Sequence, residues 1–384
     1  MNENRTPVTS TVNLAGADKE ALYDMPYSKF LGFSEDNTNS KTLSYAARIT
    51  RQLADKISLR AAYFNSSYNV DNTSTGLSAL KSRPTDYNIK QRAISRNLRD
   101  DKNSTFQLDF VGKDVYTGSI KHTFQVGFDY RIADATTTNL GSMVVDTIDV
   151  LANKIPNGVP SKLALKGAGD PVQAKYTTYG IMAQEVMTIN EYLIVILGLR
   201  YSSISTINAT AGTTTGDAWN PMLGLMVTPI KNVNIFGSYA TGTGLGSAAQ
   251  VLADGVTQAG PSTTKQWEVG FKSDWLDNRL RFNFTYFNIK TENLTNAAYI
   301  EGTNTPTNYY YKAGTLKRDG IEVELNGRIL NNLQVMLGYA YLNARYADSP
   351  SYVNGSAPMN APKHTANGWI YYTVDRGAVK GLSI

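Results

Sequence analysis

The sequence predicts an all-β protein whose strands form an antiparallel transmembrane β-barrel. The first observation is a two-residue alternation of apolar and polar side chains that recurs from Leu43 to Tyr341. The second is that the links between these strands alternate between short and long. The third is composition: only 18% of the 384 residues are charged, and Tyr outnumbers Phe by 24 to 12. Together these observations favour a sheet with one face in lipid over a soluble sandwich or propeller.

The alternation is clearest in the hairpin of residues 265–294. In its first strand Trp267, Val269 and Phe271 fall on one face, with polar residues between them. After a predicted turn at Asp277-Asn278, the second strand places four apolar residues on one face, namely Leu280, Phe282, Phe284 and Tyr286. A period of two is typical of a strand with two different faces. We expect the apolar face to meet lipid tails and the polar face to meet the lumen.

The same pattern predicts about thirteen strands, with the start of another at residues 381–384. Further series of alternating apolar residues begin at Leu43, Ile57, Phe106, Phe124, Leu193, Ile321 and Leu333. No comparable period of 3.6 residues is present, and the longest apolar run, residues 192–199, is far shorter than the ~20 residues of a spanning helix.

The links between the expected strands differ in length in a regular way. Short links are expected near residues 53–55, 117–120, 190–191, 229–232, 275–278 and 330–332. Long polar links are expected near residues 69–86, 137–172, 205–216, 242–263, 292–308 and 346–362. In an up-and-down barrel this alternation places every long link at one end, as in transmembrane barrels with periplasmic turns and longer extracellular loops.

Charged residues on the polar faces support the same orientation. A basic residue facing mid-bilayer lipid costs ~2–4 kcal/mol, so these residues are expected to point inward. The lumen- or plug-facing candidates are Glu268, Arg281, Glu322, Glu324, Asp129 and Arg131.

Several stretches in the expected order resemble the barrel of TonB-dependent outer-membrane siderophore receptors of the ferrichrome/hydroxamate type. The most specific is TKQWEVGFK (264–272) followed by RLRFNFTYF (279–287), and GTLKRDGIEVELNG (314–327) and TGSIKHTFQVGFDYR (117–131) are also similar. Weaker matches lie at residues 179–184 with 198–201, at 221–225 and at 361–364. With the N-terminal hairpins, the resemblance covers about residues 42–384.

The resemblance implies a bacterial outer-membrane receptor that imports ferric siderophores. Such receptors have a 22-stranded barrel with a plug, and the TonB–ExbB–ExbD complex supplies energy through that plug. We find no plug, TonB box or signal peptide, so the chain is expected to be an internal piece with about 13–14 of the 22 strands. Residues 1–41 are expected to be an irregular extracellular lead-in and residues 42–384 the incomplete barrel. Outer-membrane lipid and lipopolysaccharide are the further expected partners.

Ligand-binding candidates are aromatic residues at the long-link ends of strands, namely Tyr309, Tyr311, Trp219, Tyr176 and Tyr87. Each could instead belong to the interfacial aromatic girdle of a membrane protein. Lys312, Lys317 and Arg318 could attract an anionic ligand, or could pair with lipopolysaccharide or loop carboxylates.

The sequence offers little for catalysis. There is no Cys, and the two histidines, His122 and His364, lie far apart. We therefore expect no enzyme activity, no metal site and no cofactor, and the mild net charge of +5 gives no nucleic-acid site. The alternatives are a TonB-dependent receptor for a cobalamin, glycan or peptide, an adhesive or structural barrel, and a passive porin.

Overall fold

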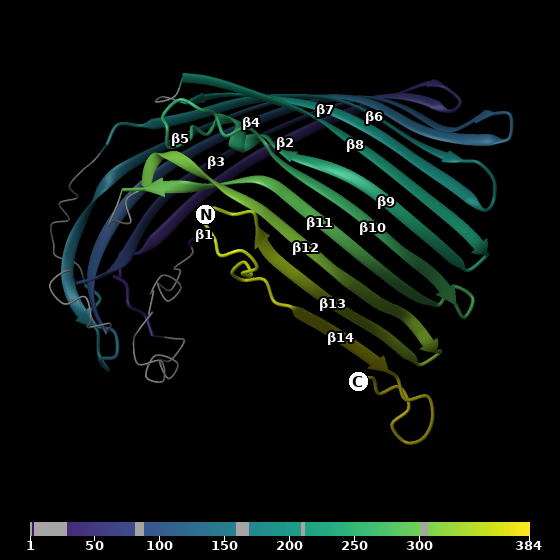
Figure 1. The fold of residues 1–384 in the computed structure, drawn as a ribbon. Coiled ribbons are helices and arrows are strands. Elements are labelled where there is room, and N and C mark those ends of the chain that lie inside the picture. The colour runs from purple at the N-terminus through teal and green to yellow at the C-terminus, as the bar shows by residue number, and fades with distance from the viewer. Residues whose placement is uncertain (1, 4–28, 81–87, 159–168, 209–211, 301–305) are drawn as a thin grey trace.

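The strands form one curved antiparallel sheet in which spatial order follows chain order from β1 to β14 (Figure 1). The computed structural model describes residues 2–3, 29–80, 88–158, 169–208, 212–300 and 306–384. The strands are β1 (Asn2–Glu3), β2 (Asn37–Ala54), β3 (Ile57–Ala79), β4 (Ile89–Thr117), β5 (Ile120–Asp149), β6 (Val172–Thr188), β7 (Leu193–Asn208), β8 (Gly212–Ile230), β9 (Val233–Gly244), β10 (Ser262–Trp275), β11 (Leu280–Tyr299), β12 (Pro306–Leu330), β13 (Leu333–Ala347) and β14 (His364–Tyr372). A short 3-10 helix, η2, covers Leu245–Ala249. Among the described residues, no helix is long and apolar enough to cross a membrane.

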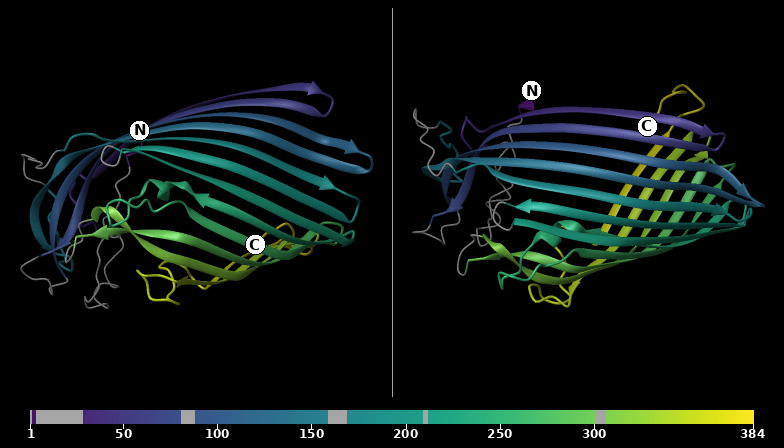
Figure 2. Two further views of the ribbon diagram at one scale, coloured as in Figure 1. Left: turned by 45° about the horizontal axis from the view of Figure 1, so that its top comes forward. Right: turned by 90° about the horizontal axis from the view of Figure 1, so that it is seen from above.

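The predicted all-β antiparallel architecture is confirmed. The two views of Figure 2 show a half-open cylinder wall, with β2 and β14 near its two edges. After β14 the chain turns back, and Ile384 and Tyr372 exchange backbone hydrogen bonds of 2.9 Å, which matches the expected start of another strand. β2 begins at Asn37, before the predicted boundary at residue 42, and the division of the chain into lead-in and barrel stays a prediction.

The predicted alternation of links holds at all six short turns, which lie between β2 and β3, β4 and β5, β6 and β7, β8 and β9, β10 and β11, and β12 and β13. We call the side of the sheet with these turns the short-turn end and the opposite side the long-link end. The prediction of a long link at 205–216 is wrong, because β7 continues to Asn208 and β8 begins at Gly212.

The error has a physical cause in the length of the strands. β7 has 16 residues and β8 has 19, whereas a tilted strand needs only ~9–11 residues to cross a bilayer. Beyond the membrane both faces can be polar, so the alternation disappears although the backbone stays paired. Cross-strand side-chain bonds such as Thr38 Oγ1 to Asn72 Oδ1 (2.7 Å) support these polar extensions.

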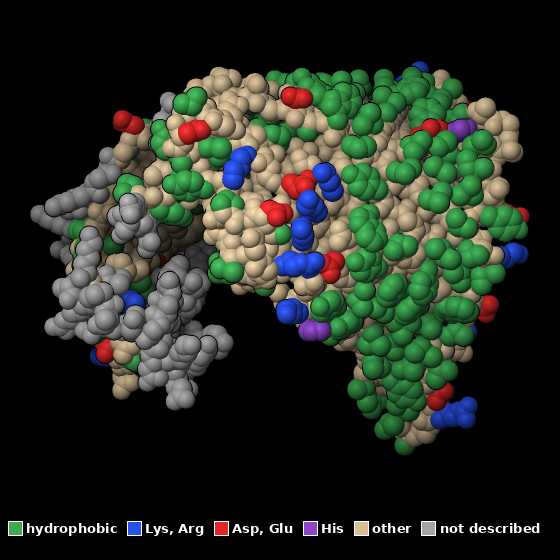
Figure 3. All heavy atoms as spheres, viewed as in Figure 1, with side chains coloured by type: hydrophobic (Ala, Val, Ile, Leu, Met, Phe, Trp, Pro, Cys, Tyr) green, Lys and Arg blue, Asp and Glu red, His purple; other side chains and the backbone are tan. Residues whose placement is uncertain are grey.

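The register confirms that the apolar residues of the 265–294 hairpin share a face. Val269 lies opposite Tyr286, and Phe271 lies opposite Phe284. Phe284 in turn lies opposite Val323 of β12. Hydrophobic side chains cover this convex face over the strands at the right of Figure 3, and residues such as Trp267 and Val269 are well exposed there. The apolar side of the sheet is therefore its outside, where lipid replaces a protein core.

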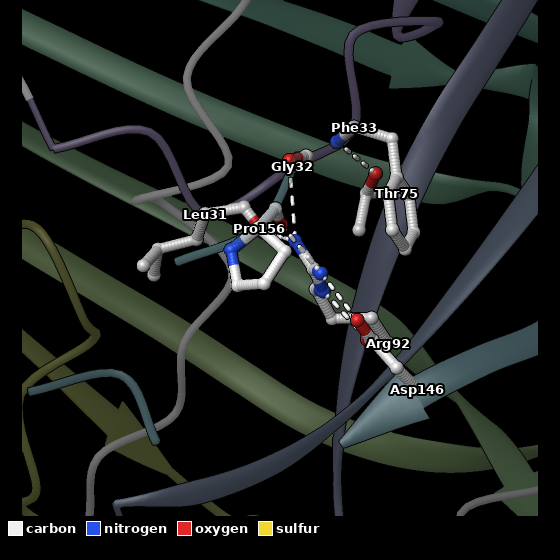
Figure 4. A network of polar contacts seen from close by, with 7 residues as sticks. All are labelled: Leu31, Gly32, Phe33, Thr75, Arg92, Asp146 and Pro156. Carbon is white, nitrogen blue, oxygen red and sulfur yellow. Dashed lines mark hydrogen bonds and ion pairs between the residues drawn. The ribbon is translucent and has the colours of Figure 1, made fainter. Parts of the chain in front are cut away.

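A buried arginine holds the segment before β2 against the long-link end of β4 and β5 (Figure 4). Arg92 is fully buried, and its Nε donates to Asp146 Oδ1 at 2.8 Å. Its Nη1 donates to the carbonyl oxygen of Leu31 at 3.1 Å, and its Nη2 donates to that of Pro156 at 2.8 Å. One guanidinium thus connects three chain segments that are distant in sequence.

Phe33 and Asp36 complete this attachment. The Arg92 guanidinium carbon lies 4.1 Å from the Phe33 ring centroid, a cation–π geometry. The Phe33 N–H donates to Thr75 Oγ1 at 3.1 Å, and Thr75 Oγ1 donates to Asp36 Oδ1 at 2.7 Å. Burial raises the pKa of Asp36 above the usual range of a carboxyl. Together with Arg92, these contacts fix the segment on the sheet.

We predict that Arg92→Ala releases this segment, because it leaves the Asp146 carboxylate without its main partner. Breaking a buried ion pair costs about 3–5 kcal/mol. The expected result is faster hydrogen exchange at the Phe33 and Ser34 amides, which donate to Thr75 and to the Asn157 carbonyl. Arg96→Ala removes an exposed pair with Asp71 and should have little effect. Equal exchange in the two variants would contradict this role of Arg92.

We also predict opposite tolerances for two adjacent residues of β12. Val323 lies on the convex face, so Val323→Arg should destabilise the membrane-inserted protein by about 2–4 kcal/mol. Glu322→Gln, on the other face, should be nearly neutral. Urea unfolding from phospholipid vesicles measures both, and a reversed order would show that the faces are assigned wrongly.

Candidate functional site on the concave face

The register places all six predicted lumen residues on the concave face. In β11 and β12, Asn283 lies opposite Glu324, and Thr285 lies opposite Glu322, on the side away from Phe284 and Val323. The same parity puts Glu268 and Arg281 on this side, together with Asp129 and Arg131 in β5. Whether these residues meet a plug or a ligand stays a prediction.

The predicted residues divide between the two ends of the wall. Arg281 lies near the short-turn end, where its Nε is 2.9 Å from Asp274 Oδ1. Glu324 accepts a hydrogen bond from Asn283 Nδ2 at 3.1 Å, and Glu268 accepts one from Gln266. The contacts of Arg281 and Glu324 thus join neighbouring strands, whereas Gln266 and Glu268 lie on the same strand, β10.

Four charged or aromatic residues form a cluster on β5, β6 and β7. Arg200 is 2.8 Å from Asp129 in an ion pair. The Arg131 guanidinium carbon lies 5.3 Å from the Tyr176 ring centroid, and Arg131 Nε donates to Asn103 Oδ1 at 2.7 Å. The structure therefore brings together Tyr176, Arg131 and Asp129, which were predicted separately. The sequence analysis did not include Arg200 among the lumen-facing candidates. Its position between Leu199 and Tyr201 in an alternating strand could have indicated it.

A second group lies around Arg318, on β11, β12 and β13. A cavity of about 380 Å³ opens here, lined among others by Phe287, Leu316, Arg318, Glu322, Leu342 and Pro362. Arg318 Nη2 donates to Thr291 Oγ1, but its Nε is buried without a hydrogen-bond partner. Gly320 leaves room for the Phe287 ring, since a Cβ there would lie 2.7 Å from it. A guanidinium with one buried N–H left without a partner, beside apolar walls, suits an anionic group on a partly apolar ligand.

The long link after η2 docks on the long-link end of β12, beside Tyr309 and Tyr311. The Tyr310 N–H donates to the Val251 carbonyl oxygen at 2.9 Å, and the Ala253 N–H donates to that of Tyr310 at 3.0 Å. Tyr309 and Tyr311 remain exposed, at 42% and 53%. They are therefore accessible at the long-link end of β12.

Lys312 is occupied by this docked link. Its Nζ donates to the Ala259 carbonyl oxygen and to Asn293 Oδ1. Asn293 Nδ2 donates to the carbonyl oxygens of Ala259 and Pro261 at 3.0 and 2.8 Å. The structure thus gives Lys312 a local role that the sequence interpretation did not foresee.

Trp219 and Tyr87 complete the predicted set. Trp219 is 61% exposed on the convex face, on the same side as Leu223. Its ring centroid lies 4.9 Å from that of Tyr201, which is 6.1 Å from that of Tyr179. This row favours the interfacial girdle over ligand contact for Trp219. Tyr87 lies outside the described residues.

The histidines lie on the convex face. His122 Nδ1 is 2.6 Å from Glu185 Oε1, near the short-turn end. His364 Nδ1 is 2.9 Å from the Tyr339 hydroxyl. Each imidazole thus has a neighbouring partner on the outer surface, and the two belong to separate regions of the sheet.

A convex face covered by apolar side chains, a polar concave face and tight turns at one end define the wall of a transmembrane β-barrel. A family model described as "TonB dependent receptor-like, beta-barrel" matches residues 2–382. The chain therefore belongs to the TonB-dependent receptor family, whose barrels lie in the outer membrane.

Curated relatives share the sequence at low identity. The metal-pseudopaline receptor CntO of Pseudomonas aeruginosa (strain UCBPP-PA14) is 23% identical, covering 94% of this chain and 51% of its own length. The probable TonB-dependent siderophore receptor PiuA of Acinetobacter baumannii is 27% identical over 74% of this chain and 44% of its own. The chain spans about half the length of these relatives.

Solved structures share the fold. The ferric-catecholate import receptor Fiu of E. coli K12, in its closed form, superimposes with a TM-score of 0.72 at 20% identity. The match covers 94% of this chain and 57% of that receptor. The resemblance in fold thus extends over nearly the whole sheet.

We predict that Lys312→Met releases the link that follows η2. The variant loses the ammonium hydrogen bonds to Ala259 and Asn293, and bonds to charged groups contribute about 1.5–3 kcal/mol. The Ala253 and Tyr310 amides should then exchange about tenfold faster or more. Lys317→Met is the matched control, since Lys317 makes no ion pair among the described residues. Unchanged exchange in Lys312→Met would contradict the docking role.

Proposed function

We propose that the chain forms part of the barrel wall of an outer-membrane receptor that imports a ferric siderophore with energy from TonB–ExbB–ExbD. The observation that carries the proposal is that cationic groups lie beside aromatic groups on the concave face. These groups lie on the long-link side of the paired charges near the short-turn end. Arg131 with Tyr176 forms one such group, and Arg318 in its cavity forms another. Family membership and the siderophore receptors among the relatives support it.

Ferric siderophores are bulky chelates whose metal-binding oxygens carry negative charge. A guanidinium can donate two hydrogen bonds to such oxygens, while an aromatic ring offers a flat contact surface. In this proposal Arg131 and Arg318 donate to the chelate, and Tyr176 contacts its apolar part. The concave position of these residues gives them access to a ligand that passes through the lumen.

In this proposal the apolar convex face contacts the membrane lipid. The concave face then lines the lumen through which the ligand passes. A lumen wall of this kind acts by binding and orienting its cargo. The iron is cargo in this proposal, held by the siderophore and not by residues of the chain.

We predict that Arg131→Gln and Arg318→Gln each weaken binding of the transported ferric siderophore by about tenfold, because each removes one charge-assisted donor. Arg281→Gln is the matched control, since Arg281 shares the concave face but lies at the short-turn end with Asp274. Binding to whole cells of radio-iron complexes of catecholate, hydroxamate and carboxylate siderophores measures the effect.

Uptake by the same cells tests the energy source. Transport should stop in cells that lack TonB, while surface binding remains. Binding of a cobalamin, glycan or peptide with no response to any ferric siderophore would replace the iron assignment. Uptake of small solutes without TonB would favour a passive pore.

A further inference from the structure

Asp36 is a buried carboxyl group that no cation neutralises. Its side chain lies at the long-link end, and among the described residues it takes part in no ion pair. Its Oδ1 accepts a hydrogen bond from Thr75 Oγ1 at 2.7 Å. Its Oδ2 lies against the backbone of Gly32, at the place where a Cβ would otherwise stand. Burial of a charge without a charged partner is unfavourable, so these surroundings favour the neutral form of the carboxyl group.

The carboxyl group belongs to the attachment of residues 29–36, which we call the latch segment. The Asp36 N–H donates to the Phe33 carbonyl oxygen at 3.0 Å and closes a turn directly before β2. Thr75 Oγ1 of β3 holds both ends of this turn, because it accepts from the Phe33 N–H and donates to Asp36. The charge on Asp36 therefore acts directly on the contacts that dock the latch segment.

The charges around Asp36 come from its own segment, from β4 and from β5. Glu35, the preceding residue, is exposed and adds a negative charge. Arg92 of β4 donates to the Gly32 carbonyl oxygen at 3.3 Å (Figure 4), but its guanidinium is already paired with Asp146 of β5. Burial raises the pKa of Asp36, and the charge of Glu35 raises it further. The hydrogen bond from β3 opposes this rise without cancelling it.

We propose that the latch segment is pH-sensitive, and that Asp36 tightens its docking in mildly acidic medium and loosens it at neutral pH. On detachment Asp36 enters water, where an aspartate has a pKa of ~3.9. Docking is therefore favoured by a bound proton. This contribution is complete below about pH 4 and is lost as the pH rises through the higher pKa of the docked state. Detachment in this interval releases one proton.

The direction of the pH dependence distinguishes Asp36 from the other buried contact of the latch segment. Arg92 donates to the carbonyl oxygens of Leu31 and Pro156 while it pairs with Asp146. Protonation of Asp146 would remove this ion pair, so a latch segment controlled by Asp146 would loosen in acid. Control by Asp36 gives the opposite sign.

Detachment of the latch segment changes the long-link end of the sheet. Leu31 packs against Ile148 and Val150 in a buried apolar cluster. The Ser34 N–H donates to the Asn157 carbonyl oxygen at 2.7 Å, in the link that follows β5. Loss of these contacts exposes the cluster and frees the link. The pH thus controls the order of this end of β3 to β5, whichever ligand the protein transports.

Hydrogen exchange of the membrane-inserted protein between pH 4 and pH 8 tests the proposal. The observable is the protection factor of the Phe33 and Ser34 amides, which corrects for the intrinsic pH dependence of exchange. In the wild type this protection should fall by up to about tenfold per pH unit, as for one released proton, and then level off. Asp36→Asn should remove the slope, because its amide stays neutral and its oxygen still accepts from Thr75.

Glu35→Gln is the matched control, since it removes an exposed carboxylate from the same turn. The slope should persist in this variant. A spin label on Ser34→Cys gives a second readout that is free of exchange chemistry, and the chain has no other Cys. The mobility of the label should rise with pH when Asp36 is present and stay constant with Asp36→Asn.

Three results would overturn the proposal. Protection that is constant from pH 4 to pH 8 would show that no titrating group controls the latch segment. Protection that falls in acid would assign the control to Asp146. A slope that persists in Asp36→Asn, or that disappears in Glu35→Gln, would assign it to another carboxyl group.

Discussion

The structure depends on the need to pair every backbone N–H and C=O where water is absent. In a bilayer an unpaired group costs several kilocalories per mole, so strands must bond to neighbours along their whole membrane length. The order β1 to β14 meets this requirement with neighbours in sequence at every step. Alternating faces, tight turns and long strands all follow from that one condition, because each strand has lipid on one side and the lumen on the other.

The same condition distributes the chemistry of the chain. Charges that would be costly in lipid gather on the concave face, where Asp129 pairs with Arg200. On the convex face, charges occur mainly beyond the apolar band, as in the ion pair of Glu292 with Lys265. An exception is His122 with Glu185, which pair with each other on the outer surface near the short turns. The position of a charged residue along its strand thus decides which partner it needs.

Much of the fold was predictable because the two-residue period reports directly which face is buried in lipid. The period assigned Val323 and Glu322 to opposite faces, and the register agrees. It failed between residues 205 and 216, where Ser and Thr continue the strands in water without any alternation to reveal them. Trp219 shows a second limit, since an aromatic residue at a strand end suits a ligand contact and a girdle equally until its face is known.

The candidate site was predictable only residue by residue. Alternation placed Arg131 and Tyr176 on strands, but their approach to one another depends on the register between β5 and β6. The buried contacts of Arg92 were not predictable, because they join residues 31, 92, 146 and 156, which no local pattern relates. Sequence spacing carries no information on such long-range polar contacts.

The great length of β4 and β5 also determines which surface of this protein is exposed beyond the membrane. With 29 and 30 residues, they rise well beyond the ~9–11 residues that lie in the bilayer. Much of the exposed surface is therefore a paired sheet, in which neighbouring positions come from chain segments far apart in sequence. An antibody against this region recognises a discontinuous epitope. Linear peptides copied from β4 or β5 are therefore poor immunogens for raising antibodies that bind the native surface.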